Sequence, residues 1–456
     1  MNTGNRFESG VQEQSEQSSQ PYSPEIPGRN RLQKGLGLVM AIAVLGAGGY
    51  FAEEKLSHGP TSPGQSILEN LHETIPLGDI QTAFNIAGQR LLQTAKTLPT
   101  GIFPYSTDNK GNWKLREGPK GWIAGFFPGS LWLMYEQTGK EMWKQEAETW
   151  TYPIKSKTAG ERDHEIGLVF IPSYGNGYEL TKSEAYKKAL LDTAATQASK
   201  YNSQVGAIGS VIEGSNNSSF RVVLDNIMSL ELLFWAAKNG GDRTDYNIAT
   251  QHALTVMNNF VRPNGSVYHD ANFDPITGKL ERRYNDQGYS DTSTWSRGQA
   301  WALAGFTMAY QATGNPQFLD TAQKTADYFI NNLPSDYVPY WDYQAPNIPE
   351  APRDSSAAAI AASYLLELST LDPKPSQQEK YFVAGQNILA SLISPRYLAK
   401  KGDAILAHAT QNMGAQSYDT GLVYGDYYLL QALERYEKIT ARPSARQSSL
   451  QIGLSR

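Results

Sequence analysis

The 456-residue sequence contains no cysteine. This absence excludes disulfide bonds, thiolate nucleophiles and zinc sites built on thiolate ligands, and it is compatible with export to an oxidising compartment. Blocks of basic residues are missing as well: the chain has 40 Lys and Arg residues and 45 Asp and Glu residues, for a net charge of −5. A mildly acidic chain of this kind is not expected to bind nucleic acid.

Motifs of several common enzyme classes are also absent. The sequence has neither a phosphate-binding Gly-x-x-x-x-Gly-Lys-Ser/Thr loop nor a Gly-x-Ser-x-Gly nucleophile elbow. Its six histidines do not show metal-site spacing, because His164 and His269 are far apart and neither has a histidine four residues on. We therefore predict neither a metal nor a cofactor. The chain does have 26 Tyr and 9 Trp, a supply of aromatic faces suited to a sugar-binding cleft.

The N-terminal part of the chain differs from the remainder. Residues 1–34 are rich in Ser, Gln, Glu, Asn, Gly and Pro, and we expect them to be disordered because they can bury little apolar surface. An uncharged run follows over 35–51 (GLGLVMAIAVLGAGGYF). As a helix it would span roughly 25 Å, slightly less than a hydrocarbon core of about 30 Å. Basic residues precede this run and two glutamates follow it, a charge bias that places the N-terminus in the cytoplasm.

These features predict a single-pass membrane anchor over 35–51, with the rest of the chain on the extracytoplasmic side. A cleaved signal peptide, which would leave the protein secreted, and a buried core helix are the alternatives. We expect a linker containing Pro and Gly over 52–77, a catalytic domain over 78–437 and a disordered tail over 438–456. No prediction of the oligomeric state follows from the sequence.

A helical hairpin pattern recurs through the predicted catalytic domain. In each copy an apolar, helix-like run ends, a short polar turn follows, and a second helix begins. The first runs end near Tyr135, Tyr178, Phe234 and Tyr310, with weaker copies near Leu366 and Leu429. Their spacing is too irregular for a solenoid. The pattern predicts an all-α fold in which helix pairs close into a toroid and rim loops carry the chemistry.

Two of the turns contain capping signals. Thr181 followed by Glu184 matches a capping box at the start of a helix. Asn315 is suited to cap another helix, and Pro316 to occupy its first position, where a missing N–H group costs nothing. Apolar residues recur at three- and four-residue spacing from Phe318 onwards, which predicts one buried face for this helix.

Carboxylates embedded in apolar segments are the candidates for catalysis. Asp225 lies in RVVLDNIMSL, where burial would disfavour the charged form, as a general acid requires; the alternative is a helix N-cap. Glu165, in RDHEIG, has a similar setting, with a solvated loop acid as the alternative. Arg297 lies between Trp295 and Trp301, and its planar guanidinium is suited to the carboxylate of a sugar. An Arg that only stacks on Trp is the alternative for that position.

These residues belong to a longer series of motifs in a fixed order. The segments are GWIAGFFPGSLW (121–132), HEIG (164–167), DNIMSL (225–230), STWSRGQAW (293–301), VPYWDY (338–343), PRDSSAAAI (352–360) and YGDYY (424–428). Together they resemble the unsaturated glucuronyl hydrolases, glycoside hydrolase family 88, over about residues 121–436. The resemblance implies an (α/α)6 barrel, which agrees with the recurrent hairpins.

The resemblance also implies an activity. Enzymes of this family remove a 4,5-unsaturated uronic acid from the non-reducing end of oligosaccharides left by a polysaccharide lyase. They hydrate the C4=C5 double bond instead of attacking the anomeric carbon, and one carboxylate acts first as an acid and then as a base. By position that residue is Asp225, and Glu165 matches the second carboxylate of the site. The resemblance assigns these residues to the substrate pocket: Trp122, His269, Gln287, Trp295, Arg297 and Trp301.

Two positions depart from the pattern of the family. Glu165 stands where the family usually has Asp, which moves the carboxylate by roughly 1.5 Å, and Asp286 stands where it usually has His. Two alternatives therefore stay open: a sugar-binding protein without activity, and an ordinary glycosidase that uses Asp225 and Glu165 as an acid–base pair. The related unsaturated rhamnogalacturonyl hydrolases are a third, although the sequence GQAW after Arg297 favours the glucuronyl type.

Overall fold

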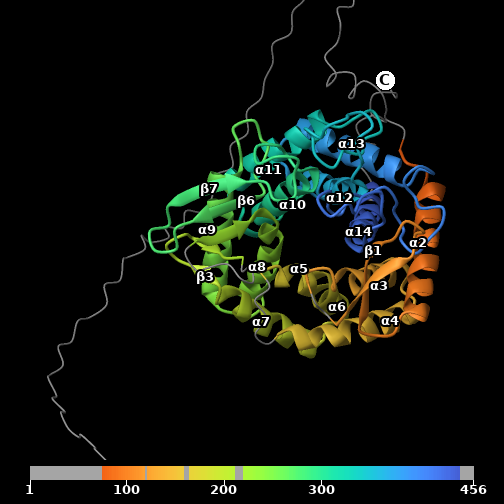
Figure 1. Cartoon of the computed structure of the whole chain (residues 1–456). Coiled ribbons are helices and arrows are strands. Elements are labelled where there is room, and N and C mark those ends of the chain that lie inside the picture. The colour runs from red at the N-terminus through yellow and green to blue at the C-terminus, as the bar shows by residue number, and fades with distance from the viewer. Residues whose placement is uncertain (1–73, 119–120, 159–163, 211–218, 442–456) are drawn as a thin grey trace, which may run out of the picture. The chain divides into compact units, whose positions relative to one another are not determined.

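Helices form most of the structure and are arranged in a ring (Figure 1). The computed structural model describes residues 74–118, 121–158, 164–210 and 219–441, all of which belong to one unit over 62–456. The predicted disordered segment, the membrane anchor and nearly all of the predicted linker lie outside these residues. Within the described part of the chain, no helix is long and apolar enough to cross a membrane.

The helices follow one another along the ring with short turns inside each pair. The α-helices are α2 (Leu77–Thr97), α3 (Phe126–Thr138), α4 (Glu141–Thr151), α5 (Ile166–Phe170), α6 (Asn176–Thr181), α7 (Glu184–Ala198), α8 (Leu230–Lys238), α9 (Arg243–Phe260), α10 (Ser296–Thr313), α11 (Pro316–Asn331), α12 (Ser355–Leu371), α13 (Pro375–Leu392) and α14 (Val423–Thr440). Shorter helical turns are η1 (Tyr152–Thr158), η2 (Ile171–Gly175) and η3 (Leu224–Ser229).

Packing between neighbouring helices closes the ring. Helix α10 packs against α11 and α12, α12 packs against α13 and α14, and α14 packs against α3, so the last helix contacts the first hairpin. Nearly every side chain of α10 and α12 is buried. The sequence of α12, SSAAAIAASYLLELSTL, explains this burial because its small residues allow neighbouring helices to approach on several sides. The chain is mostly helical, as predicted, and the arrangement agrees with a toroid.

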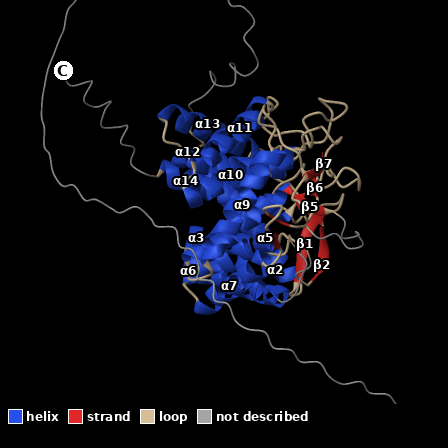
Figure 2. Ribbon diagram, turned by 90° about the vertical axis from the view of Figure 1, so that its left-hand side faces the viewer, coloured by secondary structure: helices blue, strands red, loops and turns tan. Residues whose placement is uncertain are grey.

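Short strands form in the loops between helices, which the all-α prediction did not include. The antiparallel pairs are β1 (Ile102–Thr107) with β2 (Trp113–Glu117) and β3 (Tyr201–Asn202) with β4 (Ala207–Ile208), and a three-stranded sheet has the order β5 (Phe220–Val223), β6 (Asp270–Phe273), β7 (Leu280–Tyr284). Figure 2 shows β1, β2 and β5 to β7 together with long loops on one side of the helices. Strands β5 and β6 come from distant segments, so helical periodicity could not indicate their pairing.

Helix α11 agrees closely with its prediction. The Asn315 side chain accepts a hydrogen bond from the Gln317 N–H group at 3.0 Å, and Pro316 is the first helical residue. The predicted apolar face is buried at Phe318, Leu319, Ala322, Ala326, Phe329 and Ile330. Local capping chemistry and periodicity therefore determine both the start of this helix and its orientation.

The predicted capping box at Thr181 was wrong. Thr181 does not cap α7: it ends α6, its Oγ1 donates to the Gly177 carbonyl at 2.6 Å, and Ser183 occupies the N-cap position. The reason is that Lys182 adopts a left-handed conformation, with φ of 53°, which ends α6 just before α7 begins. Helix α2 begins at Leu77, inside the predicted linker, and α14 continues to Thr440, three residues beyond the predicted end of the domain.

Candidate active site

Asp225 lies where strand β5 passes into η3. The residue is only 6% exposed, and it does not cap the turn, because Val223 holds the N-cap position of η3. The helix-cap alternative is therefore wrong. Pairing of β5 with β6 places Val223 opposite Asp270, and the Leu224 N–H group donates to the His269 carbonyl at 2.8 Å. This pairing brings Asp225 Oδ1 to 3.6 Å from His269 Nε2.

His269 is the centre of a chain of alternating charges. Its Nδ1 lies 2.7 Å from Asp270 Oδ2, and Asp270 Oδ1 accepts a hydrogen bond from Arg221 Nε at 2.6 Å. Burial opposes protonation of the imidazole, but the attraction of Asp270 and Asp225 outweighs it and raises the pKa of His269 to about 10. His269 is therefore a cation at neutral pH. Burial likewise opposes ionisation of Asp270, but His269 and Arg221 outweigh it, so the pKa of Asp270 lies below its usual value.

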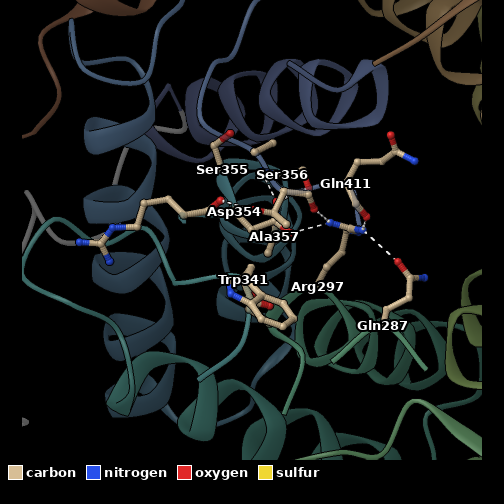
Figure 3. A network of polar contacts seen from close by, with 12 residues as sticks. Gln287, Arg297, Trp341, Asp354, Ser355, Ser356, Ala357 and Gln411 are labelled. Atoms are coloured by element: carbon tan, nitrogen blue, oxygen red, sulfur yellow. Dashed lines mark hydrogen bonds and ion pairs between the residues drawn. The ribbon is translucent and has the colours of Figure 1, made fainter. Parts of the chain in front are cut away.

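Arg297, in the first turn of α10, forms a second network (Figure 3). Its NH1 group donates to Asp354 Oδ2 at 2.5 Å and to the Thr410 carbonyl at 2.6 Å. Its NH2 group donates to the Gln411 carbonyl at 2.7 Å and lies 3.5 Å from Gln287 Oε1. Both terminal nitrogens are thus directed at protein oxygens, and Arg297 links α10 to α12 and to the 410–411 loop. Its contact with a substrate carboxylate stays a prediction.

Asp354 supports this network from the start of α12. Its Oδ1 accepts hydrogen bonds from the Ser356 and Ala357 N–H groups at 3.1 and 3.3 Å, as an N-cap does, while Oδ2 pairs with Arg297. Sequence reasoning singled out neither Asp354 nor Asp270. The available signals were their positions in the segments PRDSS (352–356) and YHD (268–270): the first belongs to the motif series, and the second contains His269.

Aromatic rings connect the two networks. The Trp295 ring is 4.8 Å from the His269 ring and 4.5 Å from the Arg297 guanidinium carbon, so it lies between the two cations. Trp122 is partly exposed and packs at 4.7 Å against Tyr424. Trp301 is only 1% exposed and meets Trp122 edge-on at 6.5 Å. The geometry gives Trp301 the role of a support for Trp122, and little of its own surface is available to a sugar.

Glu165 immediately precedes helix α5, which packs against η3. The two backbones touch at Gly167, where a Cβ atom would lie 2.5 Å from the Ser229 carbonyl oxygen. The Glu165 side chain is 14% exposed and its Oε2 lies 4.0 Å from His164 Nε2. A mostly buried carboxylate beside a histidine does not fit the solvated-loop alternative. Glu165 thus starts from an element in direct contact with the turn that carries Asp225.

Gln287 and its neighbours form a loop held by buried acids. The Asp286 N–H group donates to Asp270 Oδ2 at 3.4 Å, and the Tyr289 N–H group donates to Asp342 Oδ2 at 2.9 Å. These bonds hold Gln287 beside Arg297. Asp286 itself is exposed and lies 3.5 Å from Arg221, so the residue that departs from the family pattern joins the same charge network.

The described residues contain no cluster of three or more His, Cys, Asp or Glu side chains placed to hold a metal ion. The arrangement instead offers a buried carboxylate, Asp225, with an imidazolium 3.6 Å away. A second carboxylate, Glu165, and a partly exposed indole, Trp122, complete the set. Such a site can transfer protons to and from a bound sugar.

Comparisons with known proteins give consistent results. Residues 97–368, more than half of the chain, match the family model described as Glycosyl Hydrolase Family 88. The chain is 40% identical to an unsaturated glucuronyl hydrolase of Formosa agariphila over 327 residues, which are 70% of this chain and 81% of that protein. It is 33% identical to an unsaturated glucuronyl hydrolase of a Bacillus species over 344 residues, 74% of this chain and 91% of that protein.

A solved structure is similar over nearly its whole length. The crystal structure of an unsaturated glucuronyl hydrolase specific for heparin has a TM-score of 0.76 and 37% sequence identity to this chain. The match covers 80% of this chain and 98% of that one. The similarity therefore extends over nearly all of that structure and over most of this chain.

Proposed function

Because this chain belongs to glycosyl hydrolase family 88, we propose that it removes a 4,5-unsaturated uronic acid from the non-reducing end of oligosaccharides released by a polysaccharide lyase. The observation that carries the proposal is the buried Asp225 with its carboxylate 3.6 Å from the His269 imidazolium. The helical ring is accordingly assigned as an (α/α)6 barrel, with the site among the loops on one side.

Asp225 supplies the proton chemistry of the hydration. Its protonated carboxyl group donates a proton to C4 of the vinyl ether, and the carboxylate that results takes a proton from the water molecule that adds at C5. The net change is addition of one water molecule across the C4=C5 bond. The hemiketal formed at C5 opens, and the glycosidic bond at C1 is then lost with release of the remaining saccharide.

The surrounding charges fit these two steps. The His269 cation faces, at 3.6 Å, the carboxylate that remains on Asp225 after the first proton transfer. Asp270 and Arg221 keep the His269 ring in place and charged. Glu165 is assigned to the hydroxyl groups of the sugar, and Arg297 is assigned to the carboxylate of the sugar. Trp122 is assigned as the aromatic wall of the pocket.

The test uses the full chain and a panel of unsaturated disaccharides. Turnover removes the conjugated double bond, so it is followed by loss of ultraviolet absorbance. We expect Asp225→Asn to abolish the loss, while Asp320→Asn, which alters an exposed pair with Lys324 on α11, leaves it unchanged. Binding without turnover in the wild type would support a silent sugar-binding protein, and cleavage of a saturated glycoside would support an ordinary glycosidase.

We also propose that the chain is anchored in a membrane by residues 35–51, with the catalytic domain on the extracytoplasmic side. The support is the uncharged run and the basic residues before it. Fractionation of cells that express the full chain, followed by protease treatment from outside, tests the proposal. Recovery of a shortened, soluble protein would support the cleaved signal peptide instead.

A further inference from the structure

His252 is a fully buried histidine on α9 that the mechanism above does not use. Its Nδ1 accepts a hydrogen bond from the Ile208 N–H group at 2.9 Å. An imidazole nitrogen that accepts a hydrogen bond carries no proton, so the neutral ring has its proton on Nε2. Burial, reinforced by the positive charge of His164, lowers the pKa of His252 to about 3, which keeps the ring neutral at physiological pH.

Residue Ile208 links this histidine to the catalytic turn. Its carbonyl accepts a hydrogen bond from Asn226 Nδ2 at 3.3 Å, and Asn226 is buried in η3 immediately after Asp225. The backbone of one residue therefore accepts a bond from the turn that carries Asp225 through its carbonyl and donates a bond to His252 on α9 through its N–H group. The hairpin of β3 and β4 is the element through which the two are connected.

A second contact holds the same hairpin to α9. Thr255, three residues after His252, donates from Oγ1 to the Gly206 carbonyl at 2.9 Å. The hairpin is thus bonded to the helix at two points, and the Asn226 side chain donates to a residue of this hairpin. His252 supplies the point of attachment at Ile208, the residue whose carbonyl is the Asn226 acceptor.

We propose that His252 is a positioning residue: by holding the backbone of Ile208 it orients Asn226, and with it the turn that presents Asp225 to the sugar. This inference rests on the proposed function. A displacement of about 1 Å at a reacting group can lower the rate about 100-fold, so loss of this support should lower kcat. KM should change little, because the hydrogen bonds from His252 lead through Ile208 to the turn of Asp225.

The test compares two variants of His252: one keeps a hydrogen-bond acceptor in the place of Nδ1, and the other keeps only the volume of the ring. In His252→Asn, the amide oxygen can take the place of Nδ1 and still accept from Ile208. In His252→Phe, the ring volume is retained but the acceptor is lost. We expect kcat to fall about 10-fold to 100-fold in His252→Phe and much less in His252→Asn, with KM within about threefold of the wild type for both.

A double-mutant cycle with Asn226→Ala identifies the path. If His252 acts through Asn226, the double variant His252→Phe/Asn226→Ala should be as active as the less active of the two single variants. All rates are expressed per folded molecule, measured by circular dichroism, so that partial unfolding does not count as loss of kcat.

Three results would overturn the inference. The first is a kcat for folded His252→Phe equal to that of the wild type, and the second is an equal loss for the Asn and Phe variants. The third is a fold loss of kcat in the double variant that equals the product of the fold losses in the two single variants. Absence of turnover by the wild type on every disaccharide would instead overturn the proposed function, and this inference with it.

Discussion

The His269 imidazole lies between two carboxylates: its Nε2 is 3.6 Å from Asp225 Oδ1 and its Nδ1 is 2.7 Å from Asp270 Oδ2. One carboxylate, Asp225, is the proposed catalytic acid, and the other is held by Arg221 in strand β5. The pairing of β5 with β6 creates this relationship, because Asp225 closely follows the end of β5 and His269 directly precedes β6. The proposed catalytic carboxylate is therefore positioned by a strand register.

The charged state of His269 leads to a prediction for stability against pH. Its pKa of about 10 in the folded chain exceeds the ordinary value of about 6.5. The pairing thus stabilises the fold fully below about pH 6.5, and this contribution is lost as pH rises toward 10. We expect the free energy of unfolding to fall between about pH 6.5 and pH 10. In His269→Gln, the part of this fall that comes from His269 should be absent. Urea denaturation at a series of pH values measures the free energy of unfolding of both proteins.

The matched control for this experiment is His408→Gln, which alters a histidine beside Asp419 whose side chain is 44% exposed. Because solvent screens that pair, this control should change the pH dependence less than His269→Gln, which alters a side chain that is 3% exposed. An identical pH dependence for wild type and His269→Gln would contradict a charged His269.

Arg297→Gln should destabilise the fold. The substitution leaves the buried Asp354 carboxylate without its counter-ion and removes bonds to the Thr410 and Gln411 carbonyls. Loss of one partner from a buried pair costs about 3–5 kcal/mol. Denaturant unfolding of the two proteins gives the difference, with Arg282→Gln as control, since its pair with Asp291 is exposed to solvent and contributes little. If both substitutions lowered the free energy of unfolding equally, Arg297 would not act as a buried bridge.

Glu165→Gln should lower kcat/KM about 100-fold, because a neutral amide can replace neither the charge nor the proton affinity of the carboxylate. Glu165→Asp restores the residue usual in the family and should retain activity within about 10-fold of the wild type. Initial rates on the best disaccharide of the panel decide the comparison. Glu184→Gln, at an exposed position on α7, serves as control and should keep the activity of the wild type. Full activity in Glu165→Gln would mean that Asp225 works without a second carboxylate.

Gly167→Ala should reduce both stability and activity. A Cβ atom there would lie 2.5 Å from the Ser229 carbonyl oxygen, so α5 would have to move away from η3 and would carry Glu165 with it. Overpacking of this kind costs about 1–3 kcal/mol. The control is Gly78→Ala in α2, where a Cβ meets no atom within 4 Å. Thermal unfolding and kcat of both variants test the prediction, and an unchanged Gly167→Ala enzyme would refute the close contact.

Local sequence signals were sufficient for much of the fold and for the central residue of the site. Helix α11 follows from an Asn cap, a Pro at the first position and apolar spacing, all of which act within a few residues. Asp225 was identifiable because a carboxylate inside an apolar stretch is unusual, and its motif resembles that of a family. The capping box at Thr181 failed because a left-handed residue, Lys182, separates the two helices.

Contacts between distant segments account for what the sequence did not reveal. Asp270 and Arg221 join the site through a strand pairing across 49 residues, and Arg297 meets the Thr410 carbonyl across 113 residues. No periodicity encodes such partners, because they depend on how the helices pack and where the loops then meet. The sequence by itself determined a mostly helical chain, its family and its candidate acid. Only the tertiary structure decided that His269 is charged and that Arg297 bridges two helices, since both depend on which oxygens burial brings within hydrogen-bonding reach.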